Sequence, residues 1–276
     1  MSDNQKKDNK LTKTQNYLLD LLSFVHDLCI ENDIKYSLDC GTLIGAVREN
    51  GFITWDDDAD IIFKRLEYKK FLKVLKNTEL PDYVGVYYPE EKEYFFDFDV
   101  RLYYKKDRVR DDEDSIKLYD GIYSFATLDL FVLDNIPENN IKNRLFVLKQ
   151  QLVFGLAMSK RHDIKFKKYT VFERIAICFL SFIGRFYNIT TLCKLHNECS
   201  IAYTGKTNLL YCTSWSPEYP GYQFNSRLFD EYVLADFENL KLYITKSYDE
   251  VLKIEYGDDY MIPKRTHDHE NYSSKL

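Results

Sequence analysis

A dense group of carboxylates lies between residues 51 and 60, which read GFITWDDDAD. Asp58 and Asp60 directly precede an apolar run typical of a buried strand, so both face the same side of it. Two negative charges so placed repel each other unless a cation lies between them. Carboxylate oxygens suit Mg²⁺ or Mn²⁺, which usually complete their shell with waters and substrate phosphates. The pattern therefore predicts a divalent-metal site that handles a phosphorylated substrate, with Asp56 in support.

The same stretch allows two other interpretations. A calcium loop also places oxygen ligands at alternate positions, but its sixth position is normally glycine and here is Ile61. A solvated acidic turn is the second alternative, and the apolar neighbours Trp55 and Ile61 to Phe63 argue against it. The sequence favours the metal site.

A possible phosphate-binding group lies upstream, in DCGTLIGAVRENG. Gly41 and Thr42 stand where a strand gives way to a helix, and the free N–H groups of a helix start attract phosphate. An ordinary helix cap explains the same two residues. Arg48, two turns further along, offers either a fork for phosphate oxygens or an ion pair with the acidic stretch.

A third polar group occurs in YFFDFDVRLYY, which alternates polar and apolar residues. On a strand, this alternation puts Asp97, Asp99 and Arg101 on one face. That face either meets solvent or lines the binding cleft, with Arg101 on a donor phosphate. Both interpretations stay open.

The stretch GTLIGAVRENGFITWDDDADI resembles the signature of the LicD family. This family includes bacterial phosphocholine transferases, is related to the fukutin-type ribitol-phosphate transferases, and has a nucleotidyltransferase-like core. Similar segments are TLDLFVLDNIP and the C-terminal block from FENLKLYI to KRTHDH. The resemblance covers about residues 32–64, 126–137 and 236–269.

The resemblance implies a role for individual residues. Asp58 and Asp60 become the catalytic metal-binding pair and Asp129 a third catalytic carboxylate, although a strand-edge aspartate bonded to backbone is the alternative for Asp129. The residues implied in substrate binding are Gly41, Thr42, Arg48, Asp56, Arg101, Lys264 and His267. For Lys264 and His267, a disordered tail is the alternative.

The activity implied by the resemblance is metal-dependent transfer of phosphocholine, or a similar phospho-alcohol. The donor would be CDP-choline or another CDP-alcohol, the product CMP, and the acceptor a hydroxyl of a lipid-linked glycan or teichoic acid precursor. Two alternatives remain: nucleotidyl transfer to a phosphorylated small molecule or sugar, and a non-catalytic glycan-binding scaffold. Aromatic faces bind a trimethylammonium group, and the candidates are Trp55, Trp215, Tyr219 and Tyr222.

Hydrophobic periodicity places these residues on alternating helices and strands. We expect helices over 11–32, 42–50 and 66–77, strands at about 34–40, 59–63, 84–88, 94–105 and 126–133, and helices throughout 141–203. Strands then return in LLYCTSW and FENLKLYIT, before a last helix that Gly257 ends. The prediction is an α+β fold, a nucleotidyltransferase-like mixed β-sheet core flanked by helices, with a helical insertion. Its parts would be a disordered tail 1–10, a catalytic core 11–137, the insertion 138–205, and a C-terminal part 206–276 that completes the core and active site.

Composition bears on partners and location. A net charge of −6 argues against nucleic acid as a partner. The absence of a signal peptide and of C-x-x-C spacing predicts a cytoplasmic protein with reduced cysteines. A basic stretch followed by IAICFLSFI predicts peripheral contact with the inner face of the cell membrane through residues 160–187. A core helix with a solvated basic approach is the alternative.

Overall fold

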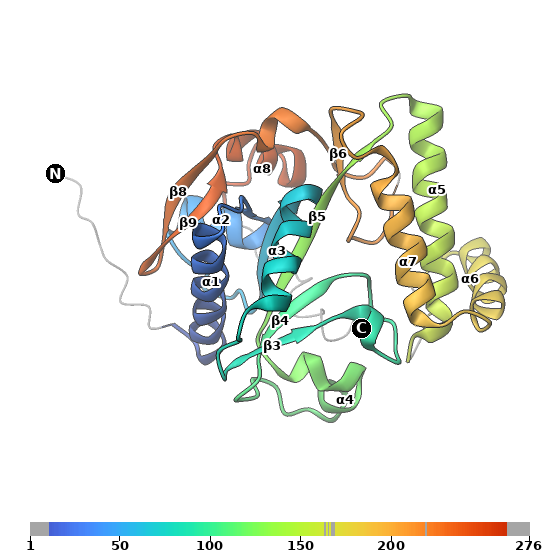
Figure 1. Cartoon of the computed structure of the whole chain (residues 1–276), viewed down its shortest axis with the longest axis horizontal. Helices are drawn as coiled ribbons and strands as arrows, with labels where there is room; N and C mark the ends of the chain where they lie inside the picture. Colours follow the sequence, from blue (N-terminus) through green and yellow to red (C-terminus); the bar gives the residue numbers. More distant parts are fainter. Residues whose placement is uncertain (1–10, 163, 165, 167–168, 219, 264–276) are drawn as a thin grey trace.

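A computed structural model of the chain describes residues 11–263, except 163, 165, 167–168 and 219. Its centre is a mixed sheet in the order β1-β2-β5-β4-β3, extended by β6 beside β5 and by β7 beside β6 (Figure 1). β2 and β5 run parallel, and the other neighbours are antiparallel. The strands are β1 (Ser37–Leu38), β2 (Ala59–Lys64), β3 (Val84–Tyr87), β4 (Val100–Tyr104), β5 (Thr127–Ile136), β6 (Leu209–Cys212) and β7 (Gln223–Asn225). The predicted α+β fold with a mixed sheet is confirmed.

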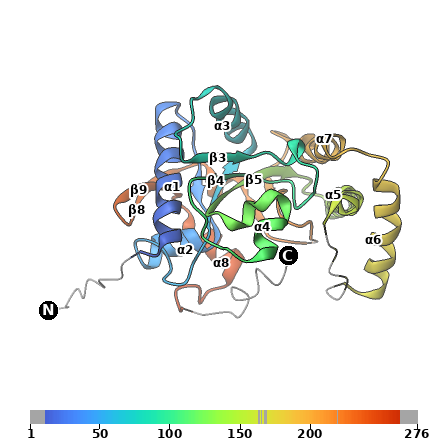
Figure 2. The ribbon, with the colours of Figure 1, turned by 90° about the horizontal axis from the view of Figure 1, so that it is seen from below.

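Helices cover both faces of this sheet. Figure 2 shows α3 (Arg65–Asn77) on one side, and α2 (Cys40–Arg48) and α8 (Tyr248–Tyr256) on the other. The long α1 (Lys13–Glu31) packs its buried apolar stripe against β4, β5 and α3. A separate hairpin, β8 (Tyr232–Phe237) with β9 (Leu240–Thr245), lies against β1.

The predicted helical insertion consists of three helices at one side of the sheet: α5 (Asn140–Ala157), α6 (Val171–Gly184) and α7 (Ile189–Ser200) (Figures 1 and 2). In the described residues, no single helix is long and apolar enough to cross a membrane. α6 and the stretch Ile189–Tyr203 pass that test together, with a bend of 118° between them.

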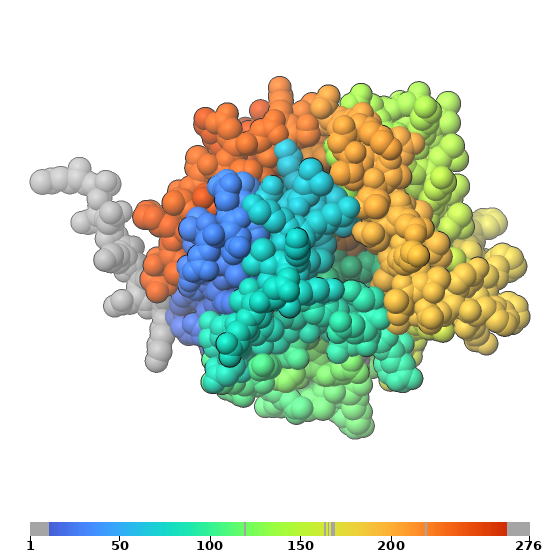
Figure 3. Space-filling view, viewed as in Figure 1, coloured from blue at the N-terminus to red at the C-terminus, as the bar shows by residue number. Residues whose placement is uncertain are grey.

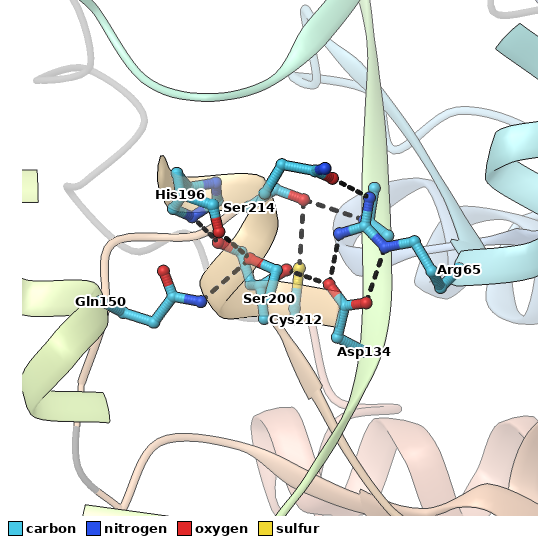
Figure 4. A network of polar contacts seen from close by, with 10 residues as sticks. Arg65, Asp134, Gln150, His196, Ser200, Cys212 and Ser214 are labelled. Atoms are coloured by element: carbon cyan, nitrogen blue, oxygen red, sulfur yellow. Dashed lines mark hydrogen bonds and ion pairs between the residues drawn. The ribbon is translucent and has the colours of Figure 1, made fainter. Parts of the chain in front are cut away.

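A buried polar network ties the insertion to the core (Figure 4). Arg65, at the start of α3, donates to Asp134 of β5 through Nε at 2.6 Å and also reaches Asn197 of α7. His196 of α7 contacts the carbonyl of Thr213 at 3.0 Å, next to Asp134. An ion pair buried this deeply is favourable only when its remaining polar atoms are also bonded, which this network achieves.

Several predicted boundaries are wrong. α1 begins at Lys13 rather than at residue 11, because Thr12 caps it and Gln15 completes a capping box. β1 has two residues instead of seven, and β4 begins only at Val100 because 94–99 forms bends. The charged loop before β5 contains a short helix, α4 (Glu113–Lys117), that Asp112 caps.

Candidate active site

Three charged side chains form a row across the middle of the sheet. Asp60 on β2 is in register with Asp129 on β5, and Asp129 is in register with Arg101 on β4. Residues in register on adjacent strands point to the same face, about 5 Å apart. Two of the predicted catalytic carboxylates and one predicted substrate-binding residue are therefore brought together from positions up to 69 residues apart in the sequence.

Two hydrogen bonds from α1 hold the acidic stretch before β2 in place. Gln15 of α1 is buried and donates to the carbonyls of Ile53 and Asp56, at 3.2 and 3.1 Å. These bonds fix the turn from which Asp56 and Asp58 project. Asp56 is buried, Asp58 is half-buried, and a side chain at Gly41 would begin 2.8 Å from Oδ2 of Asp56. A side chain at position 41 would therefore displace the buried carboxylate of Asp56.

The start of α2 holds a strained, acidic corner. Cys40 has a φ of 47°, in the left-handed region that non-glycine residues rarely adopt, and such strain is concentrated at functional sites. Asp39 precedes it, is 1% exposed, and makes no side-chain cap bond to the helix. Glu255 of α8 is also buried, and among the described residues neither of its carboxylate oxygens has a hydrogen-bond partner. Asp39 adds negative charge beside Asp60, and Glu255 adds it beside Cys40 and Asp39.

Burial and mutual repulsion change the acidity of these groups. Burial, with the charge of Asp58, raises the pKa of Asp56 to about 9. Burial also raises the pKa of Asp39 to about 7, and that of Asp129 to about 6 against the opposing effect of Arg101. The pKa of Asp60 lies well above its usual value, because of burial first and then the charges of Asp58 and Asp129. These carboxyls therefore hold their protons to a higher pH than exposed aspartates do.

Arg101 is the cation within this group. Its guanidinium makes a two-pronged contact with Asp97, at 2.7 and 2.5 Å, and its Nε lies 2.6 Å from Oδ1 of Asp129. Oδ2 of Asp99 is 3.6 Å away. Asp99 and Arg101 are only 4% and 5% exposed, so the alternative in which this polar face meets solvent is wrong. The face is buried in the site.

The other predicted substrate-binding residues differ in where they lie. Thr42 accepts a hydrogen bond from the backbone N–H of Asp60 at 2.9 Å, so its hydroxyl joins α2 to β2. Arg48 is at the opposite end of α2, where it pairs with Glu49 at 3.0 Å and donates to the carbonyl of Tyr260 at 3.3 Å. Arg48 therefore pairs with Glu49 and not with the acidic stretch, which was the alternative considered above. Lys264 and His267 lie outside the described residues.

The predicted choline-binding aromatics fall into separate groups. Trp215 packs edge-on against Phe131 of β5, two residues beyond Asp129, and against Tyr222, which is 45% exposed. Trp55 packs against the main hydrophobic core, and Tyr219 lies outside the described residues. Asp129 and Phe131 are two residues apart on β5, so their side chains point to the same face of the sheet. Trp215 packs against Phe131 and is therefore the candidate that shares a sheet face with the acidic row.

A cavity of about 320 Å³ opens elsewhere, between α3 and α7, where the surface is hollowed (Figure 3). Its lining includes Arg65, His196, Val100 and Val132. Val100 and Val132 alternate with Arg101 and Asp129, so they point to the opposite face of the sheet. The chemistry of the acidic row is therefore not inside this cavity.

The acidic residues fit a divalent cation in charge and in chemistry. In the part of the chain that the structure describes, no three acidic, histidine or cysteine side chains already converge as a metal site. Mg²⁺ needs fewer, because one or two carboxylates suffice when phosphate oxygens and waters fill the other positions. Within the described residues, Oδ1 of Asp39 and both carboxylate oxygens of Glu255 have no hydrogen-bond partner, and these oxygens, with the raised pKa of Asp60, are the features that a cation would compensate.

Without a divalent cation, we expect the protein to lose stability as the pH rises from about 4, the pKa of an aspartate in the unfolded chain, to about 9. Folding raises the pKa of Asp129, Asp39 and Asp56 to about 6, 7 and 9. In this window the folded state binds more protons than the unfolded state, so the free energy of unfolding falls with rising pH. Thermal melts in EDTA across this range measure the slope. Asp56→Asn should flatten it, whereas Asp57→Asn, at an exposed residue paired with Arg110, should not. A flat or rising wild-type profile would contradict the prediction.

Sequence reasoning missed Asp39, Gln15 and Glu255. Asp39 stood in the quoted motif, immediately before Cys40, and an acid at the end of an apolar strand is a signal that could have found it. Gln15 and Glu255 lie on helices whose periodicity marks those positions as buried, and a polar residue on a buried stripe needs a partner. Nothing in the spacing tells which partner that is.

Comparison with known proteins identifies the family of this chain. A family model described as the LicD/FKTN/FKRP nucleotidyltransferase domain matches residues 33–186, more than half of the chain. The chain therefore belongs to the LicD family. It is 28% identical over 267 residues to the lipopolysaccharide cholinephosphotransferase LicD of Haemophilus influenzae, covering 92% of this chain and 93% of that protein. An uncharacterised protein of Rickettsia prowazekii is 44% identical over 62 residues, 22% of this chain and 23% of that protein.

Proposed function

We propose that this protein is a metal-dependent, LicD-like phosphotransferase that moves phosphocholine from CDP-choline to a hydroxyl of a cell-surface glycan precursor and releases CMP. The observation that carries the proposal is the row of Asp60, Asp129 and Arg101 on adjacent strands, beside the buried acids of the DDDAD turn. The similarity to a lipopolysaccharide cholinephosphotransferase over nearly the whole chain supports both the transferred group and a glycan acceptor.

Each residue has a task that follows from its surroundings. Asp58 and Asp60 would hold Mg²⁺ or Mn²⁺, which when bound supplies positive charge to neutralise the donor diphosphate. Asp129 would accept the proton of the acceptor hydroxyl, since a pKa of about 6 leaves it ionised near neutral pH yet able to take a proton. Arg101 orients that carboxylate through its 2.6 Å contact.

The start of α2 and the aromatic residues would bind the two ends of the donor. Backbone N–H groups near Gly41 and Thr42 lie at a helix N-terminus, where phosphate oxygens are favoured. Trp215 and Tyr222 offer perpendicular aromatic faces to a trimethylammonium group. We further propose that the acceptor is lipid-linked and that the protein acts in the cytoplasm at the inner face of the membrane.

The test is transfer by the purified full chain with Mg²⁺ and a panel of CDP-alcohols: choline, ethanolamine, ribitol and glycerol. With a glycan acceptor, we expect CMP release to be fastest with CDP-choline, to depend on acceptor, and to stop with EDTA. Restored release on adding Mg²⁺ or Mn²⁺ would support the cation requirement. Release of pyrophosphate from a nucleoside triphosphate, with no CMP from any CDP-alcohol, would replace the proposal by nucleotidyl transfer. Full activity in EDTA would show that the reaction does not need a metal ion.

A further inference from the structure

The helix α6 exposes an unusual amount of apolar surface. Its outer face, here called the α6 apolar face, has exposed side chains at every turn: Phe172 (85% exposed), Ile175 (63%), Phe179 (64%), Phe182 (59%) and, just beyond the helix, Phe186 (81%). Since each such side chain has roughly 150–200 Å² of surface, the face presents roughly 600 Å² of apolar area. The largest apolar patch on a typical monomer is about 300–600 Å² and often functional.

α6 is held firmly enough to present this face. Its N-terminus has a capping box, with Thr170 and Glu173 bonded to each other's backbone. Its inner side packs on α5 at two glycines, Gly155 and Gly184, where a side chain would collide with Leu180 or with the carbonyl of Leu156. The opposite side meets nothing else in the described residues. In Figures 1 and 2, α6 stands at the edge of the molecule, on the side opposite the β8–β9 hairpin.

Charge distinguishes among the surfaces that could cover this face. Residues 160–187 contain seven Lys or Arg and two Asp or Glu, a net charge of +5 in a chain whose total is −6. Arg174 and Arg185, at the two ends of α6, are exposed. In a two-fold dimer the same patch would face itself, so two positive segments would meet. An apolar helix face with a basic surround instead matches a membrane with anionic head groups.

The length of α6 indicates how this helix would lie in a membrane. Fourteen residues extend about 21 Å, short of the roughly 30 Å hydrocarbon core of a bilayer. We propose that α6 lies flat in the interface of an anionic membrane, with its Phe side chains among the acyl chains and its basic neighbours on the lipid head groups. Membrane binding by α6 would bring the active site to a lipid-linked acceptor. The inference deepens the proposed function, and the purpose of the membrane contact rests on that function.

The test is flotation of the full chain with two kinds of vesicle, phosphatidylcholine alone and phosphatidylcholine with phosphatidylglycerol. We expect binding to the anionic vesicles that weakens with salt. The double variant Phe172→Ser/Phe179→Ser should bind at least about tenfold less, because it removes two inserted aromatic groups. The matched control is Leu66→Ser on α3, which is 67% exposed yet outside this face and should bind as the wild type does. Phe179→Trp should bind and shift its fluorescence to the blue.

Two outcomes would overturn the inference. One is equal vesicle binding by the wild type and the double variant. The other is no binding to either vesicle, together with a dimer in sedimentation velocity that the double variant dissociates, which would assign the face to a second copy. An assay of phosphocholine transfer to a water-soluble acceptor tests the proposed function separately from membrane binding. The double variant should keep that activity, whereas an inactive protein that still binds vesicles would fail only the proposed function.

Discussion

Asp60→Asn should lower phosphocholine transfer by about a thousandfold, equal to about 4 kcal/mol of transition-state stabilisation. The substitution keeps the size of the side chain and removes one of the two carboxylates proposed to hold the cation. It leaves intact the 2.9 Å hydrogen bond from the backbone of Asp60 to Thr42, so α2 and β2 stay joined. CMP release under saturating donor and Mg²⁺ is the measurement.

The same variant should be at least as stable as the wild type when no cation is present. Burial, and then repulsion from Asp58 and Asp129, raises the pKa of Asp60, so removing its charge favours the folded state. Addition of Mg²⁺ should then raise the melting temperature of the wild type but not of Asp60→Asn. Asp57→Asn is the control, since Asp57 is 56% exposed and only pairs with Arg110 at the surface. Retention of about a tenth of wild-type turnover by Asp60→Asn would show that the cation is not held there.

The parts of this site that could be predicted are those set by local pattern. The alternation of DADIIF places Asp58 and Asp60 on one side of a strand whatever the rest of the chain does, and β2 is found where the pattern puts it. The family resemblance extended this to Asp129, in a segment that no spacing connects with Asp60. Their pairing depends on β2 and β5 being parallel neighbours.

The parts that could not be predicted depend on contacts between distant segments. The sequence YFFDFDVRLYY alternates well enough for a strand from residue 94, yet β4 starts at Val100 because Phe95 and Phe98 pack instead against Phe154 of the insertion. Arg48 could not be assigned to Glu49 rather than to the acidic stretch, because the sequence does not show which end of α2 meets that stretch. Tertiary packing decided each case.

The exposure of α6 is a third example. IAICFLSFI has the composition of a buried helix, and the alternative of a core helix was reasonable from the sequence. The structure excludes a buried outer face, since Phe179 and Phe182 remain 64% and 59% exposed. Periodicity identifies which residues share a face, but only the three-dimensional fold shows whether another element covers it.

Arg101→Gln should produce the largest loss of stability, about 3–5 kcal/mol in the free energy of unfolding. Arg101 is 5% exposed, and its guanidinium contacts Asp97 and Asp129, with Asp99 at 3.6 Å. Glutamine cannot supply positive charge, so the buried Asp99 and the half-buried Asp97 and Asp129 would lose their compensating cation. Urea unfolding at neutral pH measures the effect. Arg110→Gln is the control, because its partner Asp57 is exposed and its loss should cost less than about 1 kcal/mol.

Two further measurements distinguish this electrostatic cause from a packing defect. Adding Asp97→Asn to Arg101→Gln should restore part of the lost stability, because it removes one of the uncompensated charges, and the double-mutant cycle gives the coupling energy of the pair. Acid should also narrow the difference in the free energy of unfolding between Arg101→Gln and the wild type. Burial and Asp97 already raise the pKa of Asp99, and protonation neutralises this carboxylate. A gap that stays constant with pH, or a loss no larger than that of Arg110→Gln, would mean that the carboxylates around position 101 do not depend on its charge.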